Sequence, residues 1–376
     1  MKEKNKIKII VATGGTGGHI CTALAIADEL IEKNVDVLLV GSQIGLEKKI
    51  ISGKYRFKST SQRPLLGKKM KAKLMFPIFL IIALVQAVKI LLKEKPDGVI
   101  GTGGFGSFNC VFIASLLGIP TIISEIDSIP GLTTKILSIF VYEIWAAFPC
   151  AKENLPSKKV HIGGFPVRKE ITMCTKNIKD FGLKENKFTV FVFGGSRGAQ
   201  AINKVMPKTI ELLGKDFQFI WQTGNTNNEG KSDNVYISNF INDMGSVYGN
   251  SDILVSRSGA LTIGEIMATN IPAILIPYPY ATQQHQMKNA KLLEKRGLAR
   301  IIPEPKLTPE KLAQEIKKYI AEKHNKINCE QKIEKISNAA KLIADRIIEI
   351  AQRSRKNNFI RSSKEQIRTS NNINSK

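Results

Sequence analysis

The chain has 376 residues, 43% of them hydrophobic and 7% aromatic, a composition typical of a folded protein long enough for two domains. Its net charge of +24 favours anionic partners such as nucleic acid, an acidic membrane surface or phosphorylated substrates, although a coding bias toward Lys, Ile and Asn explains part of it equally well. The five cysteines are scattered without a CxxC pair, which argues against a disulfide framework and against a zinc site.

One pattern occurs twice along the chain. The apolar run Lys6–Thr13 ends at GGTGGH (Gly14–His19), and the similar run Lys187–Phe193 ends at GGSRGAQ (Gly194–Gln200). Lys6–Thr13 is too short for a signal peptide, so we expect a first strand there. Glycines let main-chain N–H groups approach a ligand, and a following helix N-terminus attracts phosphate. A single copy could simply tighten a turn, but two matched copies predict two nucleotide-binding domains that face a central cleft.

The first half of the chain alternates strands with helices, which predicts a parallel sheet covered on both faces. The predicted strands are Val35–Val40, Gly98–Ile100, Thr121–Ser124 and Val160–Ile162, and the predicted helices include Thr22–Glu32 and Phe108–Leu117. We expect Gly163–Arg168 (GGFPVR) to be the hinge to the second half.

The segment Leu65–Lys95 combines an apolar run with lysines on both sides. A membrane span is disfavoured because Pro77, Gln86 and Lys89 interrupt the run, whose uninterrupted part is shorter than about 20 residues. Two interpretations remain, and they are compatible: a buried helix of the first domain, or an apolar patch that dips into an anionic membrane surface.

The second half repeats the alternation and then becomes helical from about Thr308 to Ala351. Its predicted strands are Phe217–Gln222, Val235–Ser238, Ile253–Ser256 and Ala273–Ile276. The last stretch, Arg353–Lys376, carries seven basic residues and one acid among Ser and Asn, so we expect a disordered tail.

Three positions carry candidate chemistry. His19 follows the first glycine loop, where an imidazole can act as a general base or simply cap the helix. Glu265 lies in SGALTIGE (Ser258–Glu265), where its carboxylate can accept hydrogen bonds from a ribose diol or lie on a solvated helix face. The amides of Gln283–Asn289 suit sugar hydroxyls. No GxxxxGK[ST] motif is present, and the second strand ends without the acid that binds an NAD ribose, so a P-loop ATPase and a dehydrogenase are disfavoured.

Eight motifs, in this order and spacing, resemble those of the bacterial cell-wall N-acetylglucosaminyltransferases of glycosyltransferase family 28: GGTGGH, GTGGFGS, SEIDSIPGL, GGFPVR, GGSRGAQ, FINDM, SRSGALTIGE and HQMKNA. The resemblance covers roughly residues 6–350 and implies the GT-B fold, two Rossmann-like α/β domains. It implies inverting transfer of GlcNAc from UDP-GlcNAc to the C4 hydroxyl of undecaprenyl-diphosphate-linked MurNAc-pentapeptide (lipid I), giving lipid II, with no metal and no cofactor. It also implies peripheral attachment to the anionic cytoplasmic face of the cell membrane.

The resemblance also implies roles for the parts of the chain. Residues 1–164 would bind the lipid acceptor and the membrane, residues 165–352 would bind UDP-GlcNAc, and residues 353–376 would form the basic tail. His19 would be the catalytic base, and Gly103 and Gly104 would hold the acceptor diphosphate. The donor UDP-GlcNAc would contact Thr16, Gly17, Gly18, Asp127, Arg168, Ser196, Ile241, Ala260, Leu261, Thr262, Ile263, Gly264, Glu265 and Gln286.

The chain departs from the family pattern at two of these motifs. Asp127 stands where the family usually has an asparagine, and an ionised acid can only accept hydrogen bonds. Thr22 stands where a proline is common. Two other functions are compatible with the composition: a UDP-GlcNAc epimerase on the same architecture, and a basic membrane- or nucleic-acid-binding module. No recognisable nucleic-acid-reading motif supports the last, so we expect no nucleic-acid partner.

Overall fold

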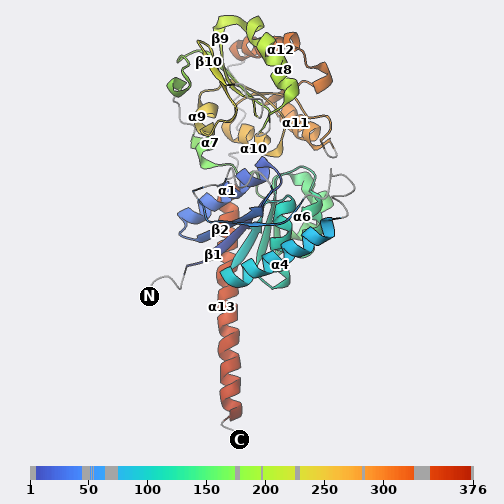
Figure 1. Ribbon diagram of the computed structural model, residues 1–376, viewed down its shortest axis with the longest axis vertical. Helices are drawn as coiled ribbons and strands as arrows, with labels where there is room; N and C mark the ends of the chain where they lie inside the picture. Colours follow the sequence, from blue (N-terminus) through green and yellow to red (C-terminus); the bar gives the residue numbers. More distant parts are fainter. Residues whose placement is uncertain are drawn as a thin grey trace. The chain divides into compact units, whose positions relative to one another are not determined.

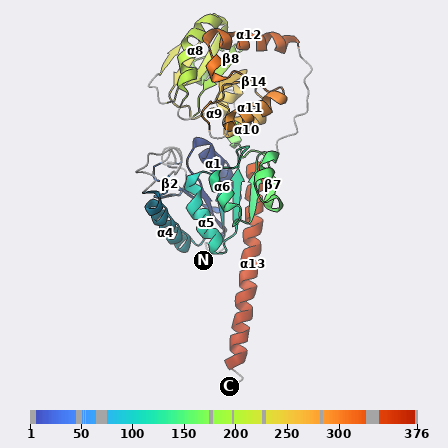
Figure 2. The same ribbon diagram turned by 90° about the vertical axis from the view of Figure 1, so that its right-hand side faces the viewer.

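The computed structural model describes residues 6–44, 51, 53, 55–63, 75–173, 178–195, 198–224, 229–281, 284–325 and 339–373. The chain divides into two compact units (Figures 1 and 2): unit 1 comprises Met1–Pro166 with Asn338–Lys376, and unit 2 comprises Val167–Ser337. Each unit contains one seven-stranded sheet within its described residues. The prediction of two Rossmann-like α/β domains is therefore confirmed.

The sheet of unit 1 is parallel throughout and has the strand order β3-β2-β1-β4-β5-β6-β7. Its strands are β1 (Lys8–Ala12), β2 (Asp36–Ser42), β3 (Phe57–Thr60), β4 (Gly98–Gly101), β5 (Thr121–Glu125), β6 (Glu143–Ala146) and β7 (Val160–Ile162). Successive side chains of a strand point to opposite faces, so Ile9 and Val11 enter one core while Ile10 and Ala12 enter the other. Both faces of this sheet are thus buried.

Helices cover these two faces in separate sets. On one face lie α1 (Gly17–Glu32) and α13 (Ala339–Ile373), which pack against each other. The other face carries α4 (Phe76–Glu94), α5 (Phe108–Leu116) and α6 (Leu132–Leu137) (Figure 2). Short 3₁₀ helices complete the unit: η1 (Phe105–Ser107), η2 (Pro149–Asn154) and η3 (Ser157–Lys159).

The sheet of unit 2 has the analogous order β10-β11-β9-β8-β12-β13-β14, with only the edge pair β10–β11 antiparallel. Its strands are β8 (Phe188–Phe193), β9 (Phe217–Gln222), β10 (Gly230–Ser232), β11 (Val235–Ser238), β12 (Ile253–Ser256), β13 (Ala273–Leu275) and β14 (Ala299–Ile301). Its helices are α7 (Lys169–Met173), α8 (Gln200–Leu213), α9 (Met244–Gly249), α10 (Ala260–Thr269), α11 (His285–Lys295) and α12 (Pro309–Asn325), with 3₁₀ turns η4 (Ile178–Phe181), η5 (Gly214–Asp216) and η7 (Glu304–Lys306).

The C-terminal end differs from the sequence prediction. Helix α13 belongs to unit 1 from its first turns, because Ala340, Ile343 and Ile347 pack into the core beneath α1. A Cβ on Gly98 would come within 2.9 Å of the Ile347 side chain, so α13 lies directly on β4. The expected boundary at residue 352 therefore falls inside this helix. The stretch expected to be a disordered tail continues α13 as far as Ile373.

Arg346 of α13 and Glu143 of β6 form an ion pair that fastens this helix to the sheet. Arg346 Nε lies 2.9 Å from Glu143 Oε1, and Arg346 holds the pKa of Glu143 below its ordinary value against the effect of burial. Trp145 Nε1 donates a further hydrogen bond, 3.2 Å long, to the same carboxylate. Truncating the arginine would leave a largely buried carboxylate without its cation.

We expect Arg346→Ala to lower the free energy of unfolding by up to about 3 kcal/mol, the cost of breaking a mostly buried ion pair. In a unit of this size the melting temperature would fall by roughly 6–12 °C. The matched control is Arg353→Ala, because Arg353 also pairs with a glutamate of α13 but its side chain is 70% exposed. Thermal melts of both variants measure the difference, and equal shifts would contradict a fastening role for Arg346.

Helix α4 is apolar but mostly exposed. Its 19 residues and its mean hydropathy of 2.1 make it, among the described residues, the one helix long and apolar enough to cross a membrane. However, it connects β3 to β4 of one sheet and packs against α5, where Asn109 Nδ2 donates a 3.0 Å hydrogen bond to the carbonyl of Ala83. Only 17% of its apolar stretch is buried, which favours the exposed patch over the buried core helix.

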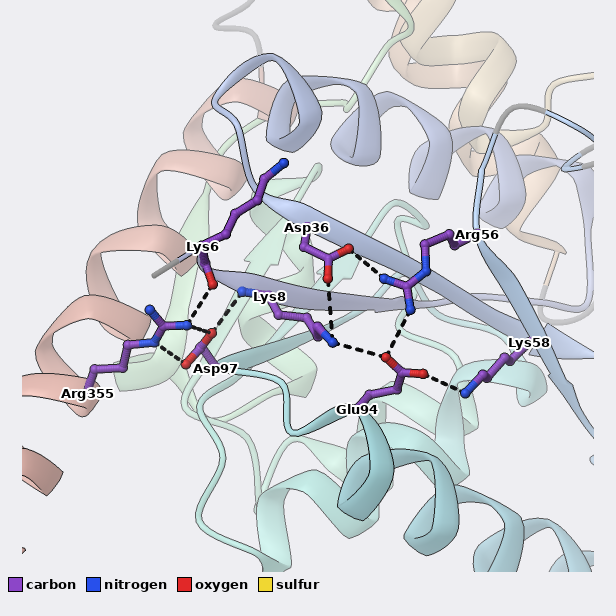
Figure 3. A network of polar contacts seen from close by, with 8 residues as sticks. All are labelled: Lys6, Lys8, Asp36, Arg56, Lys58, Glu94, Asp97 and Arg355. Atoms are coloured by element: carbon purple, nitrogen blue, oxygen red, sulfur yellow. Dashed lines mark hydrogen bonds and ion pairs between the residues drawn. The ribbon is translucent and has the colours of Figure 1, made fainter. Parts of the chain in front are cut away.

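The C-terminal end of α4 is held by a network of charges at the beginnings of the strands (Figure 3). Glu94 accepts hydrogen bonds from Lys58 at 2.6 Å, Arg56 at 3.1 Å and Lys8 at 3.2 Å. Lys58 first and then Lys8 lower its pKa to about 2, against the effect of burial. A neighbouring bidentate pair joins Arg355 of α13 to Asp97. The network thus ties both α4 and α13 to the sheet.

Candidate functional site

In unit 1 the glycine-rich loop after β1 (Gly14–His19) packs against the one after β4 (Gly101–Ser107), and the ring of His19 lies against Gly103 and Gly104. Gly103 and Gly104 both have positive φ, 85° and 71°, where only glycine is unstrained. A Cβ on Gly104 would come within 1.8 Å of the carbonyl oxygen of Gly14, and one on Gly103 within 3.0 Å of His19 Cε1. The structure therefore brings together the predicted base and the predicted acceptor-diphosphate glycines.

Hydrogen bonds fix the main chain on which His19 sits. The hydroxyl of Thr102, directly after β4, donates to the carbonyl oxygen of His19 at 2.9 Å and lies 2.9 Å from the Thr13 hydroxyl after β1. His19 Nδ1 is shielded from solvent and has no hydrogen-bond partner among the described residues. The ring of His19 is consequently held by packing against Gly103 and Gly104.

Burial is the main cause of a lowered pKa of His19, so its imidazole is neutral near pH 7 and able to accept a proton. The carboxylate of Glu125 at the end of β5 opposes this shift, because its charge favours the protonated ring. Burial in turn raises the pKa of Glu125, and Asp127 raises it further. A neutral imidazole whose protonated form is stabilised by a nearby carboxylate is suited to general-base catalysis.

Glu125 also shapes the loop that contains Asp127. Its two oxygens accept hydrogen bonds from the N–H groups of Asp127, at 2.9 Å, and Gly131, at 3.2 Å. The loop is therefore folded around a buried carboxylate, and Asp127 itself is only half-buried. Asp127 and His19 lie at the same edge of the sheet, because β1 and β5 are parallel and each residue follows the carboxyl end of its strand.

The N-terminus of α1 carries the remaining predicted donor contacts of unit 1. Thr16 is its exposed N-cap residue and makes no side-chain capping hydrogen bond, and Gly17 and Gly18 are its first residues. The first N–H groups of a helix have no partner within the helix, and this first turn contains no acidic residue. Such a helix end favours an anionic group.

In unit 2 the corresponding helix end belongs to α10. Its N-cap is Gly259, which has no side chain that could cap the helix. The N–H groups of Ala260, Leu261 and Thr262, in the first turn, have no partner within the helix. Ile263 is fully buried, and its N–H donates to the carbonyl of Gly259 at 3.0 Å, while Gly264 has no side chain to offer. The predicted diphosphate segment thus forms one uncapped helix N-terminus.

Glu265 lies in the second turn of α10 and is only 3% exposed. The Tyr248 hydroxyl donates to its Oε2 at 2.8 Å, and Arg168 Nη2 lies 3.9 Å from its Oε1. Burial raises the pKa of Glu265, while the charge of Arg168 and the tyrosine hydrogen bond oppose that shift. The solvated-surface interpretation of Glu265 is therefore excluded, and two predicted donor residues, Arg168 and Glu265, are neighbours.

The other predicted contacts of unit 2 are partly engaged within the protein. The N–H of Ile241 donates to Gln222 Oε1 at 2.9 Å, which leaves its carbonyl for a base. Gln286 Oε1 accepts from the N–H of Tyr278 at 2.9 Å, so its amide nitrogen is the group available to sugar hydroxyls. Ser196 lies outside the described residues.

Sequence reasoning assigned no role to two residues of this constellation, Glu125 and Tyr248. Glu125 carried a signal, since it lies in the quoted motif SEIDSIPGL, but its burial was not visible. Tyr248 carried none, because one tyrosine in a polar stretch indicates no partner. Within the described residues no group of three or more His, Cys, Asp or Glu could hold a metal ion.

Comparison with known proteins identifies the family. Residues 9–145 match the glycosyltransferase family 28 N-terminal domain, and residues 189–347 match the glycosyltransferase family 28 C-terminal domain. The chain belongs to glycosyltransferase family 28. This confirms the resemblance inferred from the eight motifs.

Curated relatives are similar over most of their length. A protein of Bacillus pumilus, named UDP-N-acetylglucosamine--N-acetylmuramyl-(pentapeptide) pyrophosphoryl-undecaprenol N-acetylglucosamine transferase, is 39% identical over 86% of this chain and 92% of its own. Proteins of the same name from Bacillus subtilis (37% identity, 84% of this chain and 91% of theirs) and Myxococcus xanthus (34%, 92% and 93%) are also similar. These similarities cover both units.

Solved structures share the fold. The crystal structure of Acinetobacter baumannii MurG matches with a TM-score of 0.68 and 24% identity, over 91% of this chain and 99% of that one. A UDP-GlcNAc 2-epimerase from Neisseria meningitidis matches with a TM-score of 0.63 but only 15% identity, over 91% and 100%. The two-domain GT-B fold is therefore confirmed, whereas a shared fold alone does not carry an activity.

Proposed function

We propose that this protein transfers GlcNAc from UDP-GlcNAc, with inversion, to the C4 hydroxyl of MurNAc in undecaprenyl-diphosphate-linked MurNAc-pentapeptide. The observation that carries the proposal is the buried Glu265 beyond the uncapped N-terminus of α10, in a chain whose relatives bear the name of this transferase. A carboxylate beside a phosphate-binding helix end matches the two polar parts of a nucleoside diphosphate, the ribose diol and the pyrophosphate.

Unit 2 binds the donor in this proposal. The N–H groups of Ala260 to Thr262 bind the diphosphate, and Glu265 accepts hydrogen bonds from the ribose hydroxyls. The Ile241 carbonyl accepts from the uracil N–H, and the Gln286 amide donates to GlcNAc. As the bond from C1 to the leaving oxygen breaks, negative charge develops on UDP, and Arg168 and the helix end stabilise it.

Unit 1 binds the acceptor. Gly103 and Gly104 offer main-chain N–H groups to its diphosphate, and His19 removes the proton of the C4 hydroxyl while that oxygen bonds to C1 of GlcNAc. The proton stays on the imidazole, where the charge of Glu125 supports it. Thr16, Gly17 and Gly18, which directly precede His19, contact the GlcNAc of the donor. Asp127 is a further hydrogen-bond acceptor for this sugar.

Release of UDP from UDP-GlcNAc by the purified protein tests the proposal. We expect UDP release and a glycosylated lipid only when the lipid-linked MurNAc acceptor is added. Conversion of the donor without an acceptor would instead indicate an epimerase, the second function compatible with this architecture. Absence of both reactions would overturn the proposed function.

We also propose that unit 1 attaches peripherally to the cytoplasmic face of the cell membrane through α4 and its neighbours. The supporting observation is a set of exposed apolar side chains on the helices α4, α5 and α6 and on the residues that directly follow α5 and α6. Helix α5 packs against both α4 and α6. They are Ile78, Ile81, Ile82, Val85, Leu92, Leu116, Leu117, Leu132, Ile136, Ile139 and Phe140. Lys89, Lys93 and Lys95 are exposed on or beside α4 and suit anionic headgroups.

Ile81→Asp is expected to weaken binding to vesicles that contain anionic lipid by about tenfold or more, since burying one isoleucine contributes about 1.5–3 kcal/mol. Ile81 is 61% exposed, so its replacement leaves the fold intact. Ile31→Asp is the matched control, because Ile31 is an exposed isoleucine of α1 on the other face of the sheet. Vesicle sedimentation measures both variants, and equal binding by both would contradict the proposed membrane face.

A further inference from the structure

The contact between Tyr248 and Glu265 has no place in the catalytic steps above. Tyr248 is 1% exposed, and its hydroxyl donates to Glu265 Oε2 at 2.8 Å. Burial raises the pKa of Tyr248 well above its ordinary value, so the hydroxyl remains a donor throughout the physiological range. A buried tyrosine that keeps its proton can serve a carboxylate only as a fixed hydrogen-bond donor.

The tyrosine ring is itself held in place. It packs edge-to-face against Phe191 of β8, with centroids 5.8 Å apart, and Phe191 stacks on Phe193 at 4.7 Å. Phe193 is the last residue of β8 and directly precedes Gly194, the first glycine of the motif GGSRGAQ. The position of the hydroxyl is thus fixed by the central strand of the sheet.

The carboxylate of Glu265 has two oxygens, each able to accept two hydrogen bonds. Tyr248 uses one site on Oε2, and the charged group facing Oε1 is Arg168, 3.9 Å away. Without the tyrosine, rotation of the carboxylate would be less restricted. Its charged form would also lose one of the two groups that oppose protonation of this buried acid.

We propose that Tyr248 is a positioning residue for the donor: its hydroxyl holds one oxygen of Glu265 so that the carboxylate presents its remaining acceptor sites to both hydroxyls of a ribose. Tyr248 therefore acts on ribose recognition through Glu265, without touching the nucleotide. This inference rests on the proposed binding of a uridine diphosphate at Glu265. It adds a selectivity for ribose over 2′-deoxyribose, because a site built for two hydroxyls is left with an unpaired acceptor when one is missing.

The experiment compares full-length wild type, Tyr248→Phe and the matched control Tyr236→Phe. Tyr236 is a half-buried tyrosine of β11 that packs on Phe181, away from α10. For Tyr248→Phe we expect the KM for UDP-GlcNAc to rise by on the order of tenfold, with kcat at saturating donor within about twofold of wild type. Calorimetry with UDP and 2′-deoxy-UDP should show a preference for UDP in the wild type and the control that largely disappears in Tyr248→Phe.

A double variant tests whether Tyr248 acts through the carboxylate. Tyr248→Phe added to Glu265→Gln should raise KM no further than Glu265→Gln alone, because coupled residues are not additive. Additive effects would overturn the inference, as would a Tyr248→Phe variant that keeps both the wild-type KM and the preference for UDP. A Tyr248→Phe variant with a much lower melting temperature and a kcat reduced as strongly as its kcat/KM would also overturn the inference, because those results indicate a purely structural role. If the wild type binds UDP but does not discriminate against 2′-deoxy-UDP, the proposed ribose contact of Glu265 fails, and the positioning role of Tyr248 fails with it.

Discussion

His19→Ala is expected to lower the turnover number at saturating UDP-GlcNAc and acceptor by about 100- to 10,000-fold, the usual contribution of a general base. UDP binding should be retained, since the nucleotide contacts proposed above lie on unit 2. Steady-state assay of UDP release gives the turnover number. The matched control is His161→Ala, because His161 is an exposed histidine of β7, stacked on Trp145. Near-normal turnover of His19→Ala would reduce His19 to a structural residue.

The same base predicts the direction of the pH dependence. Because burial lowers the pKa of His19, its neutral form persists to a pH below 6.5, the ordinary value for histidine. The midpoint of the acid limb of the kcat/KM profile should therefore lie below pH 6.5 in the wild type. Activity should be lost as the pH decreases through that midpoint, because His19 becomes protonated. An acid limb above that value would contradict the assignment of His19 as the buried base.

Glu265→Gln is expected to raise the KM for UDP-GlcNAc by roughly 10- to 100-fold, since a hydrogen bond to a charged group contributes about 1.5–3 kcal/mol. The amide keeps the shape of the side chain but loses the charge that faces Arg168. The turnover number at saturating donor should change little, because the ribose contact is made in the ground state and the transition state alike.

Initial rates over a range of donor concentrations measure this effect. Glu294→Gln is the control, because Glu294 is an exposed glutamate of α11. An unchanged KM for Glu265→Gln would contradict the ribose contact, and so would a loss of kcat alone.

The sequence was informative where a short run rich in apolar, β-branched and aromatic residues forms a strand. β9, β11 and β12 lie at the predicted residues, and β9 and β12 are buried along their whole length. The short strands β3, β6, β10 and β14 were not predicted. All three residues of β10 are exposed, and the polar sequence of β3 (Phe57–Thr60) shows no apolar periodicity. Such strands form because a neighbouring strand offers hydrogen-bond partners, which a local pattern does not reveal.

Helix ends and long-range partners were harder to predict. Helix α1 begins at Gly17, five residues before the predicted start, because glycines there suggested a loop although they make the first helical turn. The return of α13 to unit 1 depends on Ile343 and Ile347 meeting β1 and α1, residues more than 300 positions earlier. For the same reason the neighbours of His19 and Glu265 were visible only in the structure.

Calorimetric titration of the full-length protein with UDP tests the central claim most directly: main-chain N–H groups of α10 and the carboxylate of Glu265 together bind a uridine diphosphate. We predict saturable binding of one UDP per chain, weakened by Glu265→Gln and unaffected by His19→Ala. A folded protein that gives no binding heat with UDP, and whose melting temperature UDP leaves unchanged, would contradict the account.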